Sequence, residues 1–318
     1  MSKGLHYNNP IVLQRADPYV YRHTDGYYYF TGSVPAYDCI ELRRAKTIAE
    51  LADAETFVVW RKHESGEMSQ HIWAPELHYL DGKWYLYFAA SKVDDIWRLR
   101  PYVLECLGQD PLHDEWVERG MMQPAEGDNK TFIDFSLDAT VFEANGKRYM
   151  CWAEKTGGQF AASNLYLAEM ESPVKLKTAQ FMLTTPDYDW ERVGFWVNEG
   201  PAVIHHDGRI YLTYSASETG AAYCMGMLAA DEDSDLLDPK SWTKERYPVL
   251  RTDESRGIYG PGHNSFTEDE EGNPVMVYHA RTEAEIEGNP LYNPNRHAML
   301  MKIRWDEKTG APIFSYED

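Results

Sequence analysis

Four acidic residues and one histidine recur along the chain at nearly constant spacing. They are Asp17, Glu76, Asp138, Glu199 and His263, and they follow one another at intervals of 59 to 64 residues. Carboxyl groups gathered in one place can hydrolyse a glycosidic bond, with one group as the acid and another as the base or nucleophile. They can also bind a cation such as calcium through oxygen ligands. Calcium binding predicts a D-x-[DN]-x-[DN]-G loop or a local acidic cluster, and because the sequence contains neither, hydrolysis is favoured.

Each of these residues begins a unit with the same order of features. A short strand-like run is followed by a turn dipeptide and a second, aromatic-rich strand. The dipeptides are Asp25-Gly26, Asp81-Gly82, Asn145-Gly146, Asp207-Gly208 and Glu271-Gly272. Since Asp-Gly and Asn-Gly tolerate the positive φ of two-residue turns, each unit is predicted to contain a β-hairpin.

Five such units along nearly the whole chain predict an all-β fold, a five-bladed β-propeller, because a unit of about 60 residues with roughly four strands is typical of a propeller blade. A two-sheet sandwich is the alternative. No linker rich in Pro, Gly or Ser interrupts the repeat, so residues 1–318 are predicted to form a single catalytic domain. Lys46–Ala52 and Asp235–Lys240 are expected to form short helical turns on connecting loops.

The propeller places the recurring residues around one axis, because the first strand of each blade lines the central channel. A purely structural channel would carry small or apolar residues, since clustered buried carboxylates repel each other and are costly to desolvate. The four acids and the histidine are therefore predicted to form a functional site at the channel.

The composition favours a neutral ligand for this site. The chain has 318 residues, with 31 Lys and Arg against 51 Asp and Glu, a net charge of −20 and 14% aromatic residues. This charge argues against nucleic acid and anionic membrane surfaces as partners, because both require patches of Lys and Arg. An oligosaccharide is the expected partner, since sugar rings stack on Trp and Tyr and sugar hydroxyls hydrogen-bond to carboxylates.

The cytoplasm is the expected location. Residues 1–10 contain no apolar signal-peptide segment, and no stretch approaches the roughly 20 apolar residues of a membrane span. Cys39, Cys106, Cys151 and Cys224 are scattered without a C-x-x-C pair. They are predicted to be small buried thiols in a reducing compartment.

Five motifs occur in order, one at the start of each unit. They read Arg15-Ala-Asp17-Pro18-Tyr19-Val20, Trp73-Ala-Pro-Glu76-Leu77, Leu137-Asp138-Ala-Thr-Val-Phe142, Asn198-Glu199-Gly200-Pro201 and Gly260-Pro-Gly-His263-Asn264-Ser265-Phe266. Together they resemble glycoside hydrolase family 43, from about Asn9 to the end of the chain. The stretch from Tyr278 to His297 resembles the family's single-domain α-L-arabinofuranosidases, whereas its β-xylosidases usually add a C-terminal β-sandwich.

The resemblance implies an inverting mechanism with three acids. Asp17 matches the general base that deprotonates the attacking water, and Glu199 matches the general acid that protonates the leaving oxygen. Asp138 matches the third carboxylate, which keeps that acid protonated and oriented, and Asp134 is the alternative for this role. An inverting pair needs room for a water, about 6.5–9.5 Å between its carboxyl groups. A nearby Asp138 carboxylate would raise the pKa of Glu199 by like-charge repulsion.

Contacts to ligands are implied in the same way. His263 matches the family's axial histidine, which commonly contacts a calcium or another hydrated ion in the channel, and no organic cofactor is expected. Arg296 matches an arginine that contacts the bound sugar, with an ordinary salt bridge as the alternative. Trp73 and Phe30 are candidate walls of the sugar subsite, with packing between blades as the alternative. The neighbours of Glu76 suggest a hydrogen bond between blades rather than catalysis.

The resemblance implies an exo-acting α-L-arabinofuranosidase that removes terminal arabinofuranose from arabino-oligosaccharides with inversion. A β-xylosidase or an endo-α-1,5-arabinanase of the same family is the alternative among enzymes. A non-catalytic sugar-binding propeller is the alternative from another class. An exo enzyme needs a blind pocket and an endo enzyme an open groove, so the loops around the channel decide between these two modes.

Overall fold

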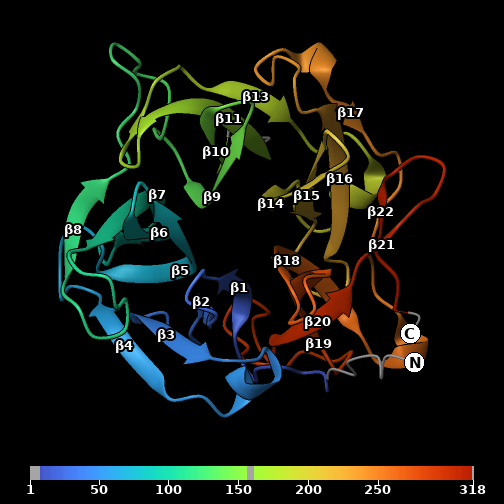
Figure 1. Cartoon of the computed structure of the whole chain (residues 1–318), viewed down its shortest axis with the longest axis horizontal. Helices are drawn as coiled ribbons and strands as arrows, with labels where there is room; N and C mark the ends of the chain where they lie inside the picture. The colour runs from blue at the N-terminus through green and yellow to red at the C-terminus, as the bar shows by residue number, and fades with distance from the viewer. Residues whose placement is uncertain (1–7, 156–160, 317–318) are drawn as a thin grey trace.

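Five antiparallel sheets surround one axis in the computed structural model, which describes residues 8–155 and 161–316 (Figure 1). Within each sheet the strands follow one another in chain order, and the first strand lies innermost (Figure 1). The predicted five-bladed β-propeller is therefore confirmed. No helix in the described ranges is long and apolar enough to cross a membrane.

The first three blades contain thirteen strands. The first blade consists of β1 (Ala16–Arg22), β2 (Tyr28–Ser33), β3 (Cys39–Ala45) and β4 (Thr56–Arg61). The second consists of β5 (Gln70–Leu80), β6 (Lys83–Lys92), β7 (Asp95–Cys106) and β8 (Trp116–Met121). The third consists of β9 (Ser136–Ala144), β10 (Lys147–Lys155), β11 (Ser163–Ser172), β12 (Lys175–Leu176) and β13 (Phe181–Thr184), the last two both paired with β11.

The last two blades are followed by a separate strand pair. The fourth blade consists of β14 (Asn198–His206), β15 (Arg209–Ala216), β16 (Cys224–Asp231) and β17 (Thr243–Lys244). The fifth consists of β18 (Tyr259–Glu268), β19 (Pro274–Arg281) and β20 (His297–Lys302), and β21 (Arg304–Trp305) then pairs with β22 (Pro312–Ile313). Short 3-10 helices occur at η1 (Ala49–Ala52), η2 (Asp189–Glu191), η3 (Pro239–Ser241) and η4 (Glu254–Arg256), so η1 and η3 lie at the two expected helical turns.

All five predicted hairpins are present, but their turns differ. In the second, third and fourth blades both residues of the dipeptide have positive φ, as in Asp81 (52°) and Gly82 (79°), and two residues link the strands. In the first and fifth blades the loops are longer, and of each dipeptide the glycine has the positive φ. The dipeptide alone therefore does not fix a two-residue turn, since Asp25-Gly26 lies in a longer loop.

The innermost strand of every blade carries a β-bulge at the start of the recurring motif. In β1 the pairing with β2 shifts between Ala16 and Tyr19, and the other four inner-strand pairings shift at the corresponding place. One residue in each bulge has a positive φ, between 43° and 55°. These residues are Asp17, Ala74, Asp138, Gly200 and His263.

The bulges correct the predicted equivalence of the five recurring residues. Asp17, Asp138 and His263 occupy the same register position, but Glu199 precedes that position by one residue and Glu76 follows it by two. The side chains of Glu76 and Glu199 therefore leave the inner strand at register positions that differ from that of Asp17, Asp138 and His263. The spacing in the sequence hid this offset, because the equivalent positions are themselves 57 to 64 residues apart, and this variation exceeds one or two residues.

In four blades the backbone N–H of this bulge residue donates to a side chain of the preceding blade. Asp17 donates to His279 Nδ1 (3.1 Å), and Ala74 donates to Ser33 Oγ (2.8 Å). Gly200 donates to Asp138 Oδ2 (3.1 Å), and His263 donates to Ser215 Oγ (2.6 Å). We call these four hydrogen bonds the blade latches. They connect neighbouring blades next to the axis, where the predicted site residues lie.

The chain start closes the ring. Ile11 N donates to Ala298 O (2.8 Å), and Ala298 N donates to Val12 O (2.9 Å), so this segment pairs with the outer edge of β20. The side chain of Asn9 adds two hydrogen bonds of 2.8 Å to the backbone of Leu300. The last blade thereby receives its fourth strand-like segment from the beginning of the chain.

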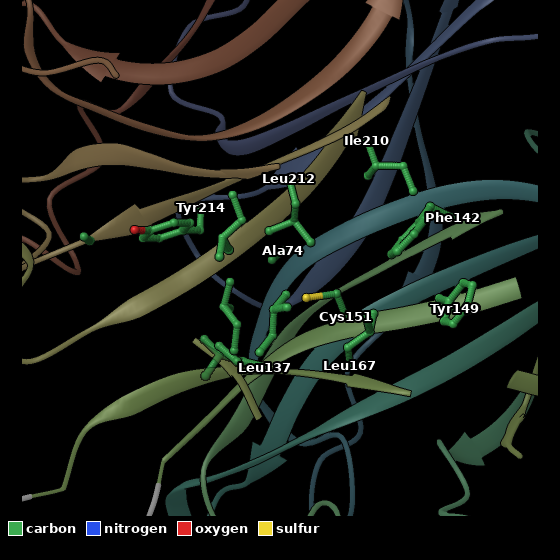
Figure 2. Packing of buried hydrophobic residues seen from close by; sticks show 14 of the residues in the cluster. Ala74, Leu137, Phe142, Tyr149, Cys151, Leu167, Ile210, Leu212 and Tyr214 are labelled. Carbon is green, nitrogen blue, oxygen red and sulfur yellow. The ribbon is translucent and has the colours of Figure 1, made fainter. Parts of the chain in front are cut away.

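Apolar side chains fill the space between neighbouring blades. Figure 2 shows one cluster, in which Leu137, Cys151 and Leu167 of the third blade face Leu212 and Tyr214 of the fourth. Burial of this surface supplies the main favourable free energy that holds the blades together. All four cysteines are buried and free, as predicted.

Candidate active site

A cavity of about 790 Å³ lies at the propeller axis. Its lining includes one residue from the inner strand of every blade: Asp17 of β1, Trp73 of β5, Asp138 of β9, Glu199 of β14 and His263 of β18. Arg296, which directly precedes β20, also lines it. Six of the seven residues predicted for the site therefore meet in one cavity, and Phe30 does not.

Asp17 is buried among cationic and hydrogen-bonding groups. Its Oδ1 lies 3.2 Å from His263 Nδ1 and 3.6 Å from Arg296 Nη1, and Ser33 Oγ donates to Oδ2 at 2.5 Å. Burial by itself would raise the pKa of Asp17, but the charges of His263 and Arg296 hold that pKa well below its usual range. The Asp17 carboxyl is therefore ionised at neutral pH and can accept a proton.

The two histidines beside Asp17 differ in charge. His279 accepts a hydrogen bond at Nδ1 from the Asp17 backbone, and burial lowers the pKa of His279 to about 4, so its ring is neutral at pH 7. Burial also opposes the charged form of His263, yet the carboxylates of Asp17, Asp138 and Glu199 raise the pKa of His263 above its ordinary value. The surrounding acids therefore favour the charged form of His263.

Asp138 is also buried, and it faces the same ring nitrogen of His263 as Asp17 does. Its Oδ2 lies 3.8 Å from His263 Nδ1 and accepts the latch hydrogen bond from Gly200, the residue after Glu199. Burial and the charges of Glu199 and Asp17 raise the pKa of Asp138 to about 8, although His263 lowers it. Asp134, the alternative third acid, does not line the cavity, and its carboxylate caps the backbone N–H of Phe135 at 2.8 Å.

Glu199 is half-buried and faces the cavity from β14. Tyr223 Oη donates a hydrogen bond of 2.8 Å to its Oε1. Burial is the largest cause of the raised pKa of Glu199, and the negative charge of Asp17 adds to it. The sequence predicted repulsion from Asp138 as the cause, so the raised pKa agrees with the expectation but its main origin differs. A carboxyl with a raised pKa keeps its proton and can donate it.

Arg296 and Trp73 form part of the cavity wall. The buried Arg296 donates from Nη2 to Tyr37 Oη at 2.7 Å, so its guanidinium is fixed between Tyr37 and Asp17. The indole of Trp73 stacks on His71, with ring centroids 4.2 Å apart, and meets the edge of Tyr37. Both side chains therefore have a defined orientation before any ligand binds.

Phe30 and Glu76 lie away from the cavity. Phe30 is buried in an apolar cluster with Val20 and Val277, because its strand β2 turns this side chain toward the fifth blade. Glu76 accepts a hydrogen bond of 2.8 Å from His78, two residues further along the same strand. The predicted sugar contact of Phe30 is not supported by this placement, and the hydrogen bond of Glu76 lies within one blade rather than between blades.

The donor groups near His263 do not fit a calcium ion held by protein ligands. Calcium takes six to eight oxygen ligands. His263 Nδ1 already faces Asp17 and Asp138, and within residues 8–155 and 161–316 no group of three or more His, Cys, Asp or Glu side chains is arranged to hold a metal ion. An ion at His263 would depend on its own water shell rather than on a cage of side chains.

The loop between β19 and β20, residues 282–296, closes one side of the cavity. Tyr37 Oη of the first blade donates to Leu291 O at 2.5 Å, and His71 Nε2 of the second blade lies 3.0 Å from Tyr292 Oη. Arg281 ties the loop to its own blade by donating to Pro290 O at 2.6 Å. The loop therefore bridges three blades, and its residues Asn289, Pro290 and Leu291 form a wall of the cavity.

Several lining residues were not predicted from the sequence. Trp97, Phe195 and Trp196 expose 51%, 65% and 46% of their surfaces and form an aromatic part of the lining. Phe195 and Trp196 are separated from the Asn198-Glu199 motif by one residue, Val197, and this proximity is the signal that could have identified them. Tyr37 and Tyr223 lie outside all five motifs, so only the fold brings them to the cavity.

Together, the propeller fold and an axial cavity with three acids, an arginine and aromatic walls define a carbohydrate-processing propeller. Residues 7–310 match Glycosyl hydrolases family 43, and the chain belongs to this family.

Relatives with assigned activities are similar over most of this chain. An extracellular exo-α-(1→5)-L-arabinofuranosidase of Streptomyces avermitilis is 47% identical over 314 residues, which cover 98% of this chain and 64% of the relative. An extracellular exo-α-(1→5)-L-arabinofuranosidase of Streptomyces chartreusis is 50% identical over 285 residues, 89% of this chain and 85% of the relative. The crystal structure of an α-L-arabinofuranosidase from Lactobacillus brevis is 51% identical, with a TM-score of 0.90 and 98% of both chains covered.

The raised pKa of Asp138 predicts a stabilising substitution. In the folded protein burial raises the pKa of Asp138 to about 8, whereas in the unfolded chain the pKa has its ordinary value of 3.8, so rising pH between these values lowers stability. Asp138→Asn keeps an oxygen acceptor for Gly200 and removes the titration. From pH 5 to pH 8 the variant should gain at least about 1.4 kcal/mol over the wild type, the equivalent of one pKa unit, in urea unfolding. A difference that stays constant with pH would contradict the assignment.

Proposed function

We propose that the protein is an exo-acting α-L-arabinofuranosidase, which releases terminal α-1,5-linked arabinofuranose from arabino-oligosaccharides with inversion. The observation that carries the proposal is that the pKa values of two acids in one cavity are shifted in opposite directions. The pKa of Asp17 is lowered and that of Glu199 is raised. Acids separated in this way can act as base and acid at the same pH. The names of the similar Streptomyces and Lactobacillus proteins support arabinofuranose as the sugar.

In the proposed reaction Asp17 acts as the general base. As an ionised carboxylate it accepts a proton from a water molecule, and this water attacks the anomeric carbon on the face opposite the leaving group. Glu199 acts as the general acid and gives its proton to the glycosidic oxygen as the bond breaks. Asp138 keeps the segment of Glu199 in place through its hydrogen bond to Gly200 N. The carboxylates supply both proton transfers, so no step needs a metal ion.

Arg296 and Trp73 are the proposed sugar contacts. A guanidinium can hold two adjacent hydroxyls, and the bonds of Arg296 to Tyr37 and Asp17 place its free N–H groups beside the base. The fixed indole of Trp73 gives a flat apolar wall for the sugar ring.

Exo action is favoured over endo action by the loop of residues 282–296. An endo enzyme needs an open groove on both sides of the cleaved bond, and this loop occupies one side through its hydrogen bonds to Tyr37 and His71. A terminal sugar therefore enters the cavity as far as the wall made by Leu291.

We also propose that the protein works in a reducing compartment such as the cytoplasm, because its four cysteines are buried and free. The two Streptomyces relatives are named extracellular. Fractionation of the native cells distinguishes the two locations. Recovery of the protein from the medium would contradict a cytoplasmic location.

Substitution of the two proposed catalytic acids should abolish most activity. Asp17→Asn and Glu199→Gln are each expected to lower kcat on α-1,5-arabinobiose, whose leaving sugar alcohol needs a proton, because a general acid or base contributes about 10²–10⁴-fold. The matched control is Asp134→Asn, whose carboxyl lies outside the cavity and should leave kcat within about twofold. An inactive wild type, or a variant of either acid with full activity, would refute the assignment.

The product pattern tests exo action and the sugar. Linear α-1,5-arabinopentaose should give arabinose and arabinotetraose as first products in chromatography, because the loop admits one sugar beyond the cleaved bond. Early arabinobiose and arabinotriose would instead indicate endo cleavage. Faster hydrolysis of 4-nitrophenyl β-xyloside than of the arabinoside would favour the β-xylosidase alternative.

A further inference from the structure

The glycines of the motif Gly260-Pro261-Gly262 make room for one tyrosine. A Cβ on Gly262 would lie 2.4 Å from Tyr223 Cε1, far inside van der Waals contact. A Cβ on Gly260, which has a φ of 56°, would lie 2.3 Å from Gly220 O, at the start of the turn that leads into Tyr223. The backbone of β18 therefore packs directly on the segment that carries Tyr223, and larger residues there would displace its ring.

Tyr223 stands between the two proposed catalytic acids. It is 2% exposed, directly precedes β16, and donates from Oη to Glu199 Oε1 at 2.8 Å. On its other side the ring lies parallel to His279, with centroids 5.5 Å apart and planes 8° apart, and His279 holds the backbone of Asp17. The ring of Tyr223 thus contacts the proposed acid, Glu199, directly. It is linked to the proposed base, Asp17, through His279.

The phenol fixes which oxygen of Glu199 is free to carry the proton. Among the described residues, Tyr223 is the side chain that hydrogen-bonds the Glu199 carboxyl, and it occupies Oε1. Because Oε1 accepts the hydrogen bond from the Tyr223 hydroxyl, the proton of the protonated Glu199 resides on the other oxygen, Oε2. With the carboxyl held at Oε1, the position of Oε2 is also restricted.

We propose that Tyr223 is a positioning residue for the general acid: its hydroxyl holds Glu199 so that Oε2 delivers the proton to the leaving oxygen. The inference rests on the proposed function of Glu199 and adds a residue that no motif contains. The 4-nitrophenolate leaving group departs without a proton, so its release is accelerated little by a positioned acid. The release of a sugar alcohol requires protonation and therefore depends on the acid. The decrease in kcat caused by removing the Tyr223 hydroxyl should therefore depend on the substrate.

The test compares two substrates with Tyr223→Phe, which keeps the ring, its stacking on His279 and its packing under Gly262. Relative to the wild type, kcat on α-1,5-arabinobiose should fall at least about tenfold more than kcat on 4-nitrophenyl α-L-arabinofuranoside, with KM changed little on both. The matched control is Tyr214→Phe. Tyr214 is also buried and also donates to a glutamate, Glu191 Oε1, at 2.8 Å, but it does not line the cavity. This variant should change both substrates by the same factor.

A double-mutant cycle gives a second readout. In a Glu199→Gln background, Tyr223→Phe should cause no further loss on arabinobiose, because the proton that it positions is absent. Equal losses on the two substrates, no loss at all, or an additive loss in the double variant would each overturn the role of Tyr223. A wild type inactive on both substrates would overturn the proposed function and this inference with it.

Discussion

The site depends on the blade latches, the hydrogen bonds from the bulged residue of an inner strand to a side chain of the preceding blade. Each latch holds a left-handed residue, a conformation that costs a non-glycine residue roughly 1–2 kcal/mol and that Asp and Asn tolerate best. The bond offsets this cost by satisfying an N–H that the bulge removes from the ladder. Ser33 shows the coupling most clearly, since it accepts from Ala74 N and donates to Asp17 Oδ2. The bonds that order the blades are therefore also bonds of the site.

Burial acts on all three acids, and their neighbours decide the outcome. Asp17 lies 3.2 Å from His263 and 3.6 Å from Arg296, so positive charge outweighs the cost of desolvation and lowers the pKa of Asp17. Asp138 and Glu199 lack a guanidinium partner in the described chain, and burial raises the pKa of both. Asp138 serves two purposes, because it also accepts the latch of the fourth blade. If this position served only to accept the latch hydrogen bond, a neutral acceptor such as the hydroxyl of Ser33 would cost less desolvation free energy than a buried aspartate.

Much of this arrangement could be predicted from the repeat, and the exceptions have physical causes. The period and the turn dipeptides give the five blades, and the motifs bring Asp17, Asp138, Glu199 and His263 to one axis. The one-residue offset of Glu199 could not be predicted, because the spacing between equivalent positions of neighbouring blades varies by more than one residue. Tyr223 and Leu291 reach the cavity through contacts between distant segments, which no local pattern encodes. Phe30 illustrates the opposite error, since an aromatic residue near a motif can face the space between blades.

The central claim is that Asp17 and Glu199 act as base and acid on opposite faces of one sugar. Proton NMR of the first-formed anomer tests this claim most directly, using 4-nitrophenyl α-L-arabinofuranoside and enough enzyme to outrun mutarotation. If Asp17 activates a water on the face opposite the leaving group, β-L-arabinofuranose appears first and the α-anomer grows only by mutarotation. Initial formation of the α-anomer would mean retention of configuration, and it would contradict the role of Asp17 as the general base.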